Sequence, residues 1–121
     1  MGLDTSHNCY HGPYSSFTDF RYALADQIDI DLDDYIGYRG YRPTKYLDTI
    51  EHDIMPLLNH SDCDGILTVE ECKRIANGLT NILDNFNEDI NYSINNFKDK
   101  IIQFRDGCLE AIQNNEEVEF H

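Results

Sequence analysis

The chain has 121 residues and carries 23 Asp and Glu against 9 Lys and Arg, so its formal net charge is −14. This length predicts a single domain, 1–121, and the 40% share of hydrophobic residues is too high for a disordered acidic tail. The negative charge argues against direct binding to nucleic-acid phosphates or to an anionic membrane surface. No run of 18 apolar residues occurs, so we expect no membrane-spanning segment.

Charge and aromatic residues divide the chain unevenly. Residues 1–46 hold 7 acidic and 4 basic residues, a net charge of −3, together with seven of the eight Tyr. Residues 47–121 hold 16 acidic and 5 basic residues, a net charge of −11. We therefore expect a Tyr-rich N-terminal segment at 1–46, a helix-loop-helix at 47–86, and a long helix with an acidic tail at 88–121.

The N-terminal third predicts one clear helix. Ser16 is placed to cap it, and apolar side chains at helical spacing extend it over 17–28. A short helix is expected over 32–36, ended by Gly37. Residues 38–43 are expected to form a loop because of their Gly and Pro content.

The next two helices flank a polar segment. The first of them is expected over 44–58, with a kink or a restart at Pro56, because proline lacks the backbone N–H that a helix interior needs. Thr68 and Glu71 form a capping box, which predicts the start of a further helix that reaches residue 86.

The last helix has the most regular pattern, with apolar residues three or four apart over 90–112. Residues 117–120 alternate polar and apolar side chains, which indicates a short strand along the body of the protein. The predicted fold class is therefore mainly α, with about four helices in one small domain and extended terminal segments.

Residues 60–71 lie between two predicted helices and resemble the calcium-binding loop of the EF-hand family. Gly65 takes the sixth position, where the chain turns sharply, and Leu67 takes the eighth, an inward-facing apolar residue on a short strand in that family. The resemblance implies a divalent cation, calcium above all, held by the following residues: His60, Asp62, Asp64, Ile66 through its carbonyl, Thr68 and Glu71.

His60 departs from that pattern, because the first ligand position is ordinarily Asp. An imidazole nitrogen is a poor ligand for calcium and a good one for zinc. Members of this family also usually carry paired loops, and the sequence has no second loop of this kind. Two other interpretations therefore stay open: a transition-metal site, and a plain Asp-Gly turn followed by a capped helix.

A second candidate metal site lies near the N-terminus. In an extended chain, His7, Cys9 and His11 would face the same side, which suits a tetrahedral zinc site. His60 is one candidate for the fourth ligand, and Asp62, Cys63 and His121 are the others. A small zinc-dependent enzyme is the function that this site would allow. The alternative is three ordinary polar residues on a flexible terminus, or a lid that packs on the core.

The four cysteines do not form a Cys-x-x-Cys pair, and no secretory signal precedes them. We therefore expect reduced thiols in a cytoplasmic protein. Cys72 and Cys108 lie on apolar helical stripes and are expected to be core residues. Cys9 and Cys63 lie beside His and Asp, which leaves a metal-binding role open for them.

Three motifs together resemble a family of small uncharacterised proteins of bacteriophages and mobile elements. They are Met-Gly-Leu-Asp-Thr-Ser-His at 1–7, Leu-Leu-Asn-His-Ser-Asp-Cys-Asp-Gly at 57–65, and Val-Glu-Phe-His at 118–121. The resemblance implies a phage or bacterial cytoplasmic protein that is complete at residue 121. It also implies that the N-terminal His/Cys segment, the central loop and the tail belong to one site.

Small acidic phage proteins often act by binding a host protein. One route is to present carboxylates where that protein expects nucleic-acid phosphates. The expected function is therefore a non-enzymatic inhibitor of a host nucleic-acid-directed or defence system, with the cation loop supporting its fold. A calcium-binding EF-hand-like module is the alternative, followed by the zinc enzyme. The plainest interpretation is that the charge only keeps the protein in solution.

Overall fold

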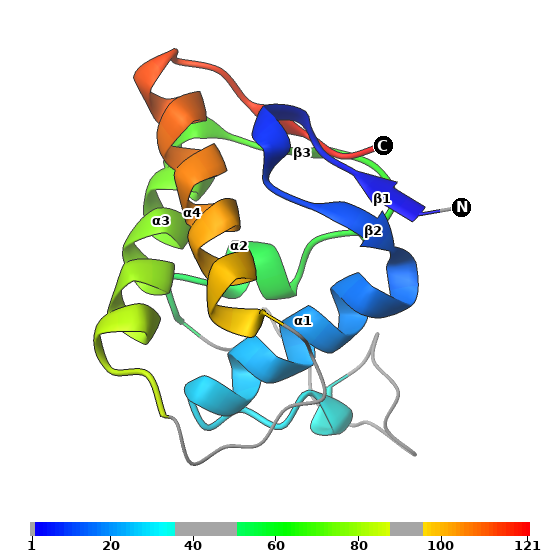
Figure 1. Ribbon diagram of the computed structural model, residues 1–121, viewed down its shortest axis with the longest axis vertical. Helices are drawn as coiled ribbons and strands as arrows, with labels where there is room; N and C mark the ends of the chain where they lie inside the picture. Colours follow the sequence, from blue (N-terminus) through cyan, green and yellow to red (C-terminus); the bar gives the residue numbers. More distant parts are fainter. Residues whose placement is uncertain (1, 36–50, 88–95) are drawn as a thin grey trace.

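The computed structural model describes residues 2–35, 51–87 and 96–121. The helices α3 and α4 lie side by side and antiparallel, α1 crosses near one end of the pair, and the short strands gather near both ends of the chain (Figure 1). The mainly α prediction is confirmed. The elements in chain order are β1 (Gly2–Asp4), η1 (Ser6–Asn8), β2 (His11–Pro13), α1 (Tyr14–Gln27), η2 (Leu32–Asp34), α2 (Met55–Leu58), β3 (Ile66–Leu67), α3 (Val69–Asp84), α4 (Phe97–Gln113) and β4 (Val118–Glu119).

Helix α1 begins earlier than the sequence predicts. Pro13, whose fixed φ suits the entry to a helix, holds the position before the first turn, so the helix starts at Tyr14. The prediction that Ser16 caps the helix is wrong, because its hydroxyl is hydrogen-bonded to the Tyr10 hydroxyl instead. The predicted apolar face is confirmed, and Phe17 and Phe20 are fully buried on it.

The segments around the middle of the chain are shorter than predicted. The expected helix at 32–36 is the single 3-10 turn η2, in which the Asp31 side chain accepts a hydrogen bond from the Asp33 N–H. The expected loop at 38–43 and the first part of the helix at 44–58 lie outside the described residues. Residues 51–54 are described and are not helical, so the helix predicted over 44–58 is wrong there; α2 begins at Met55, with Pro56 in its first turn.

The pair formed by α3 and α4 matches the sequence pattern closely. Thr68 and Glu71 form both hydrogen bonds of the predicted capping box at the start of α3. Helix α4 begins only at Phe97, because Asn96 before it has a left-handed φ of +59°, and it ends at Gln113, one residue beyond the prediction; residues 90–95 of the predicted helix lie outside the described part. In the ranges that the structure describes, no helix is both long and apolar enough to cross a membrane.

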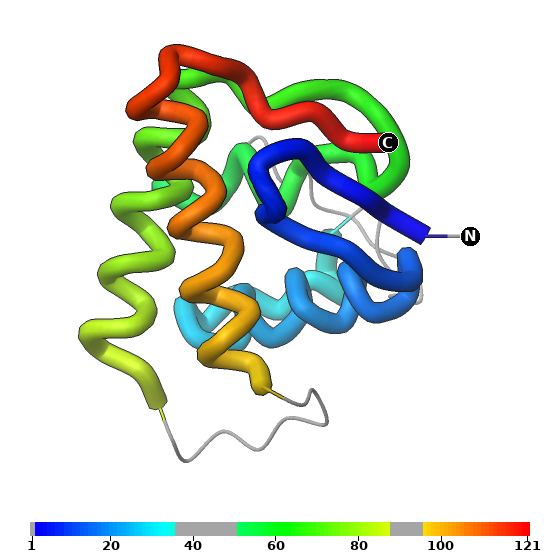
Figure 2. Tube along the Cα trace, turned by 45° about the horizontal axis from the view of Figure 1, so that its top comes forward, coloured from blue at the N-terminus to red at the C-terminus, as the bar shows by residue number. Residues whose placement is uncertain are grey.

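The strands join the two ends of the chain. β1 pairs with β2, and β3 pairs with β4, in both cases antiparallel. Asp4 and His121 exchange two backbone hydrogen bonds of 3.2 and 2.9 Å, and Thr5 bridges to Phe120, so the order across all four strands is β2-β1-β4-β3. Figure 2 shows the C-terminal segment between the N-terminal strands and the segment that contains β3. The predicted strand in the tail is confirmed.

The core is aromatic where α1, α4 and the tail meet. Phe20 contacts Phe97 and Phe104 with ring centroids 6.0 and 6.2 Å apart, and Phe17 contacts Phe120 at 6.0 Å. Burying each such ring stabilises the fold by roughly 1.5–3 kcal/mol. These contacts fix the tail, and with it the loop at 60–66, against α1.

Candidate functional site

The loop between α2 and α3 has the outline of an EF-hand loop. Gly65, at the sixth position, has a φ of +93°, a conformation that favours glycine. Leu67, at the eighth position, is fully buried on β3. In place of a second loop, the strand that pairs with β3 is β4 from the C-terminal tail, and the Phe120 N–H donates to the Gly65 carbonyl at 2.9 Å.

The imidazole of His60 lies across this loop. Its Nε2 is 2.7 Å from the Ile66 carbonyl oxygen, and its Nδ1 is 2.8 Å from the Ser61 carbonyl oxygen. The ring also packs on Phe120 with centroids 4.1 Å apart. A Cβ added at Gly65 would lie 3.3 Å from His60 Cε1, so the glycine gives the ring its room. The first position of the loop is thus joined directly to the seventh.

Both partners of the His60 ring are carbonyl oxygens, which only accept hydrogen bonds. A neutral imidazole has one N–H and can donate to one of them, whereas an imidazolium has two and donates to both. The bridge to Ile66 therefore requires the N–H at Nε2, which the imidazolium and one of the two neutral tautomers carry.

Arg21 of α1 holds the loop through a hydrogen bond to its backbone. Its Nη1 donates to the His60 carbonyl oxygen at 2.6 Å, and its guanidinium lies 4.6 Å from the centroid of the Phe17 ring. This side chain is only 6% exposed, which is rare for arginine outside a built contact. Sequence reasoning missed it, although a signal existed: Arg21 follows Phe17 by four residues, on the apolar face of α1.

The other predicted cation ligands of the loop are only partly available. Glu71 Oε1 accepts a hydrogen bond from the Thr68 N–H at 2.9 Å, and Thr68 Oγ1 accepts one from the Glu71 N–H at 3.2 Å. Asp62 is half-exposed and Asp64 is exposed. With the Ile66 carbonyl also engaged by His60, a cation would have to displace these hydrogen bonds to be bound here. Calcium at this loop stays a prediction.

The N-terminal residues of the alternative zinc site do not share one face. The expected extended segment is interrupted by the turn η1, in which His7 has a φ of +59° and Asn8 a φ of +56°. His11 is exposed and pairs with Asp4 at 3.4 Å, while Cys9 is buried. In the described parts of the chain, no three or more His, Cys, Asp and Glu are grouped so that they could hold a metal ion. Zinc here stays a prediction.

A series of hydrogen bonds between polar groups holds the N-terminal turn against the tail. Ser6 Oγ accepts a hydrogen bond from the Glu119 N–H at 2.8 Å and lies 2.8 Å from His7 Nδ1. His7 Nε2 lies 3.1 Å from a Glu116 carboxylate oxygen. A hydroxyl, an imidazole and a carboxylate in this order also occur in hydrolases, but here the hydroxyl and the carboxylate both hold the tail in place.

Three of the four thiols meet in the core. Cys72 and Cys108 are buried as predicted, and Cys9 is buried with them. Hydrogen bonds of the Cys108 thiol with Cys72 and Cys9, together with burial, raise the pKa of Cys108 far above its usual range. The hydrogen bond from Cys108 lowers the pKa of Cys72. Cys63 is exposed on the loop, with its sulfur 3.5 Å from Ser61 Oγ.

Comparisons with known proteins add no further identification: no protein family, no curated protein and no solved structure matches this chain. The site is therefore defined by its own contacts. These place the His60 loop, the N-terminal turn and the C-terminal tail in one continuous region.

Proposed function

We propose that the protein is a non-enzymatic interaction protein whose acidic surface binds the basic, nucleic-acid-binding surface of another protein. With the phage resemblance, the partner is a host protein of a nucleic-acid-directed or defence system, which this protein inhibits in the cytoplasm. The observation that carries the proposal is the placement of charge: within the described residues no Asp or Glu is buried, and 16 of the 20 are exposed.

The basic residues do little to balance that charge at the surface. Lys73, Arg74 and Arg105 pair with neighbouring carboxylates, through Lys73–Glu70, Arg74–Glu51 and Arg105–Asp106. Lys98 and Lys100 lie over aromatic rings, and Arg21 is buried. The remaining carboxylates therefore produce a strongly negative field that attracts basic partners and speeds their association.

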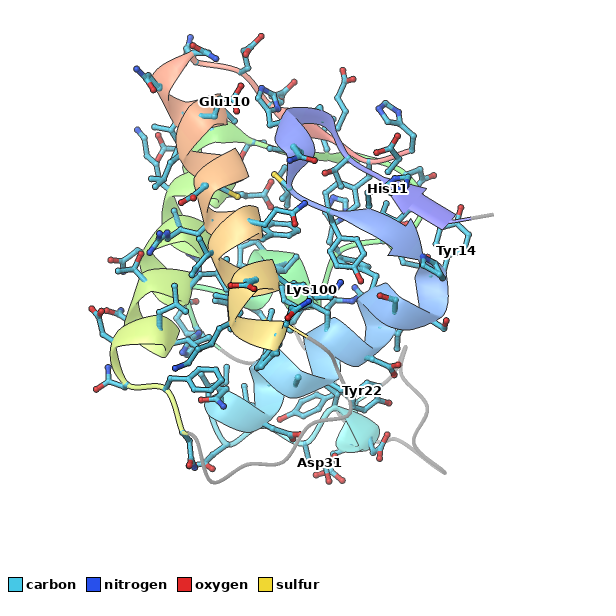
Figure 3. All side chains as sticks on the ribbon, in the orientation of Figure 1. His11, Tyr14, Tyr22, Asp31, Lys100 and Glu110 are labelled. Carbon is cyan, nitrogen blue, oxygen red and sulfur yellow. The ribbon has the colours of Figure 1, made fainter. Side chains whose placement is uncertain are left out.

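Two acidic groups stand out on this surface. The first lies in the last turn of α1 and directly after it and includes Asp26, Asp29, Asp31 and Asp33; partial desolvation, then Asp31, then Asp33 raise the pKa of Asp26. The second lies at the end of α4 and along the tail and includes Glu110. Figure 3 shows Asp31 and Glu110 at opposite ends of the protein. Duplex DNA carries one negative charge per about 1.7 Å of its axis. The basic surface of a protein that binds DNA is therefore complementary to a group of closely spaced carboxylates.

The test is capture of partners on the immobilised full chain from a nuclease-treated bacterial lysate, followed by elution with duplex DNA. We expect DNA to displace the captured protein, because both compete for one basic surface. The double variant Asp26→Asn, Asp29→Asn should bind about tenfold more weakly. The matched control is Glu51→Gln, Glu70→Gln, which changes the net charge equally at exposed positions outside both acidic groups.

If the two double variants lose affinity equally, total charge and not a defined surface explains the binding. If DNA fails to displace the captured protein, the partner is not bound through a phosphate-binding surface. Either result contradicts the proposal.

A further inference from the structure

The loop at 60–71 has the backbone turn of a cation-binding loop. The His60 side chain makes the contact that a bound cation would otherwise make. In an EF-hand loop the first-position side chain and the seventh-position carbonyl both reach the ion. Here the corresponding groups are His60 Nε2 and the Ile66 oxygen, and they are 2.7 Å apart, in direct hydrogen-bond contact. The two groups are joined to each other.

The surroundings of the ring show that its position is built into the fold. Phe120 from the tail covers one side of the ring at 4.1 Å, and Gly65 leaves the space that a Cβ would narrow. Arg21 holds the backbone of His60 itself through its carbonyl at 2.6 Å. Two segments distant in sequence thus hold His60: the tail packs on its ring, and α1 binds its backbone carbonyl.

The remaining features of a cation loop are independent of His60. The turn at Gly65, the buried Leu67 and the capping box of Thr68 and Glu71 are all formed. Asp62 and Asp64 keep accessible carboxylates at the third and fifth positions. The first position is therefore the one that departs from an oxygen-donating set.

From this geometry we infer that the imidazole of His60 is the built-in substitute for a bound cation. The native loop holds its shape without metal, and His60→Asp converts it into a calcium site. The substitution removes the bridge, frees the Ile66 carbonyl and supplies the missing carboxylate. An imidazole nitrogen would give calcium little, whereas a third Asp restores the ligand set that a hard cation prefers.

The test is calorimetric titration of the full chain with CaCl2 after treatment with EDTA, beside thermal unfolding with and without calcium. We expect no binding heat for the native chain and the same Tm in calcium and in EDTA. His60→Asp should bind calcium with a Kd of about 10⁻⁴ M or tighter, and its Tm should rise with calcium concentration. The matched control is His60→Asp, Glu71→Gln, which keeps the new carboxylate and weakens the closing ligand; it should lose the heat.

NMR of the imidazole nitrogens in the native chain gives a readout that does not depend on the folding of a variant. The His60 Nε2 signal should be that of a hydrogen-bonded N–H and should not move when CaCl2 or ZnCl2 is added. Calcium-binding heat in the native chain that Glu71→Gln abolishes would overturn the inference. So would zinc that removes the His60 N–H signal, or a folded His60→Asp variant that binds no calcium.

Discussion

Gly107 on α4 offers a direct test of how the N-terminal turn packs against the helix pair. A Cβ at this position would lie 2.8 Å from the His7 carbonyl oxygen and 3.1 Å from Cys9 Cα, and it would also meet the Cys9 sulfur. The oxygen and the Cα belong to the backbone and cannot rotate away. Gly107→Ala should therefore push η1 off the helix.

The magnitude follows from two opposing terms. Replacing Gly by Ala in a helix interior ordinarily stabilises a protein by about 1 kcal/mol. Overpacking costs about 1–3 kcal/mol, and rigid backbone neighbours place this site at or slightly above the upper end. The net loss in the free energy of unfolding should be about 2 kcal/mol, which corresponds to a decrease in Tm of roughly 5–10 °C.

Urea unfolding followed by far-UV circular dichroism measures this loss. The control is the double variant with Cys9→Ala, because removing the sulfur relieves one of the clashes. A double-mutant cycle should then give a coupling of about 1 kcal/mol between the two positions. If Gly107→Ala alone is more stable than the native chain, helix propensity dominates and the contact with η1 does not exist.

Three further predictions concern the cap, the thiols and the acidic group after α1. Thr68→Ala should lower the free energy of unfolding by about 1 kcal/mol in urea titrations, because the cap of α3 is lost. A thiol reagent such as DTNB should modify one cysteine, Cys63, in the folded protein and all four after unfolding, since the others are buried. The raised pKa of Asp26 means that the folded state binds its proton more tightly than the unfolded state, so its charge costs stability above that pKa. Asp26→Asn should therefore stabilise the protein at pH 7, and the gain should fade as the pH drops through the carboxyl range, while high salt should remove only the part that is due to Asp31 and Asp33.

The sequence predicted best what depends on neighbouring residues. The capping box at Thr68 is formed within four residues, and the repeat of α4 depends only on its own side chains. Pro56 has no backbone N–H and fits the first turn of a helix, so its place at the start of α2 also follows from local chemistry. Local chemistry determines each of these features.

The features that were missed depend on contacts between distant parts of the chain. The interior position of Cys9 requires Gly107, which lies on another helix. The sequence pattern placed His60 and Ile66 at two ligand positions of one loop. The packing of Phe120 on the His60 ring, in contrast, depends on where the tail lies. The left-handed conformations of His7 and Asn8, which ended the expected extended segment, are stabilised by the contact of η1 with the tail and α4.

The strand order β2-β1-β4-β3 has a consequence for how the protein folds during synthesis. Domains fold as their segments leave the ribosome, and contacts between residues far apart in sequence slow the process. β1 emerges first and β3 in the middle, yet β4 must emerge and insert between them before either finds its full set of partners. The helices α1 and α3 are available for local folding well before that moment. The sheet, and with it the cover over His60, therefore forms only after α1 and α3 have been synthesised.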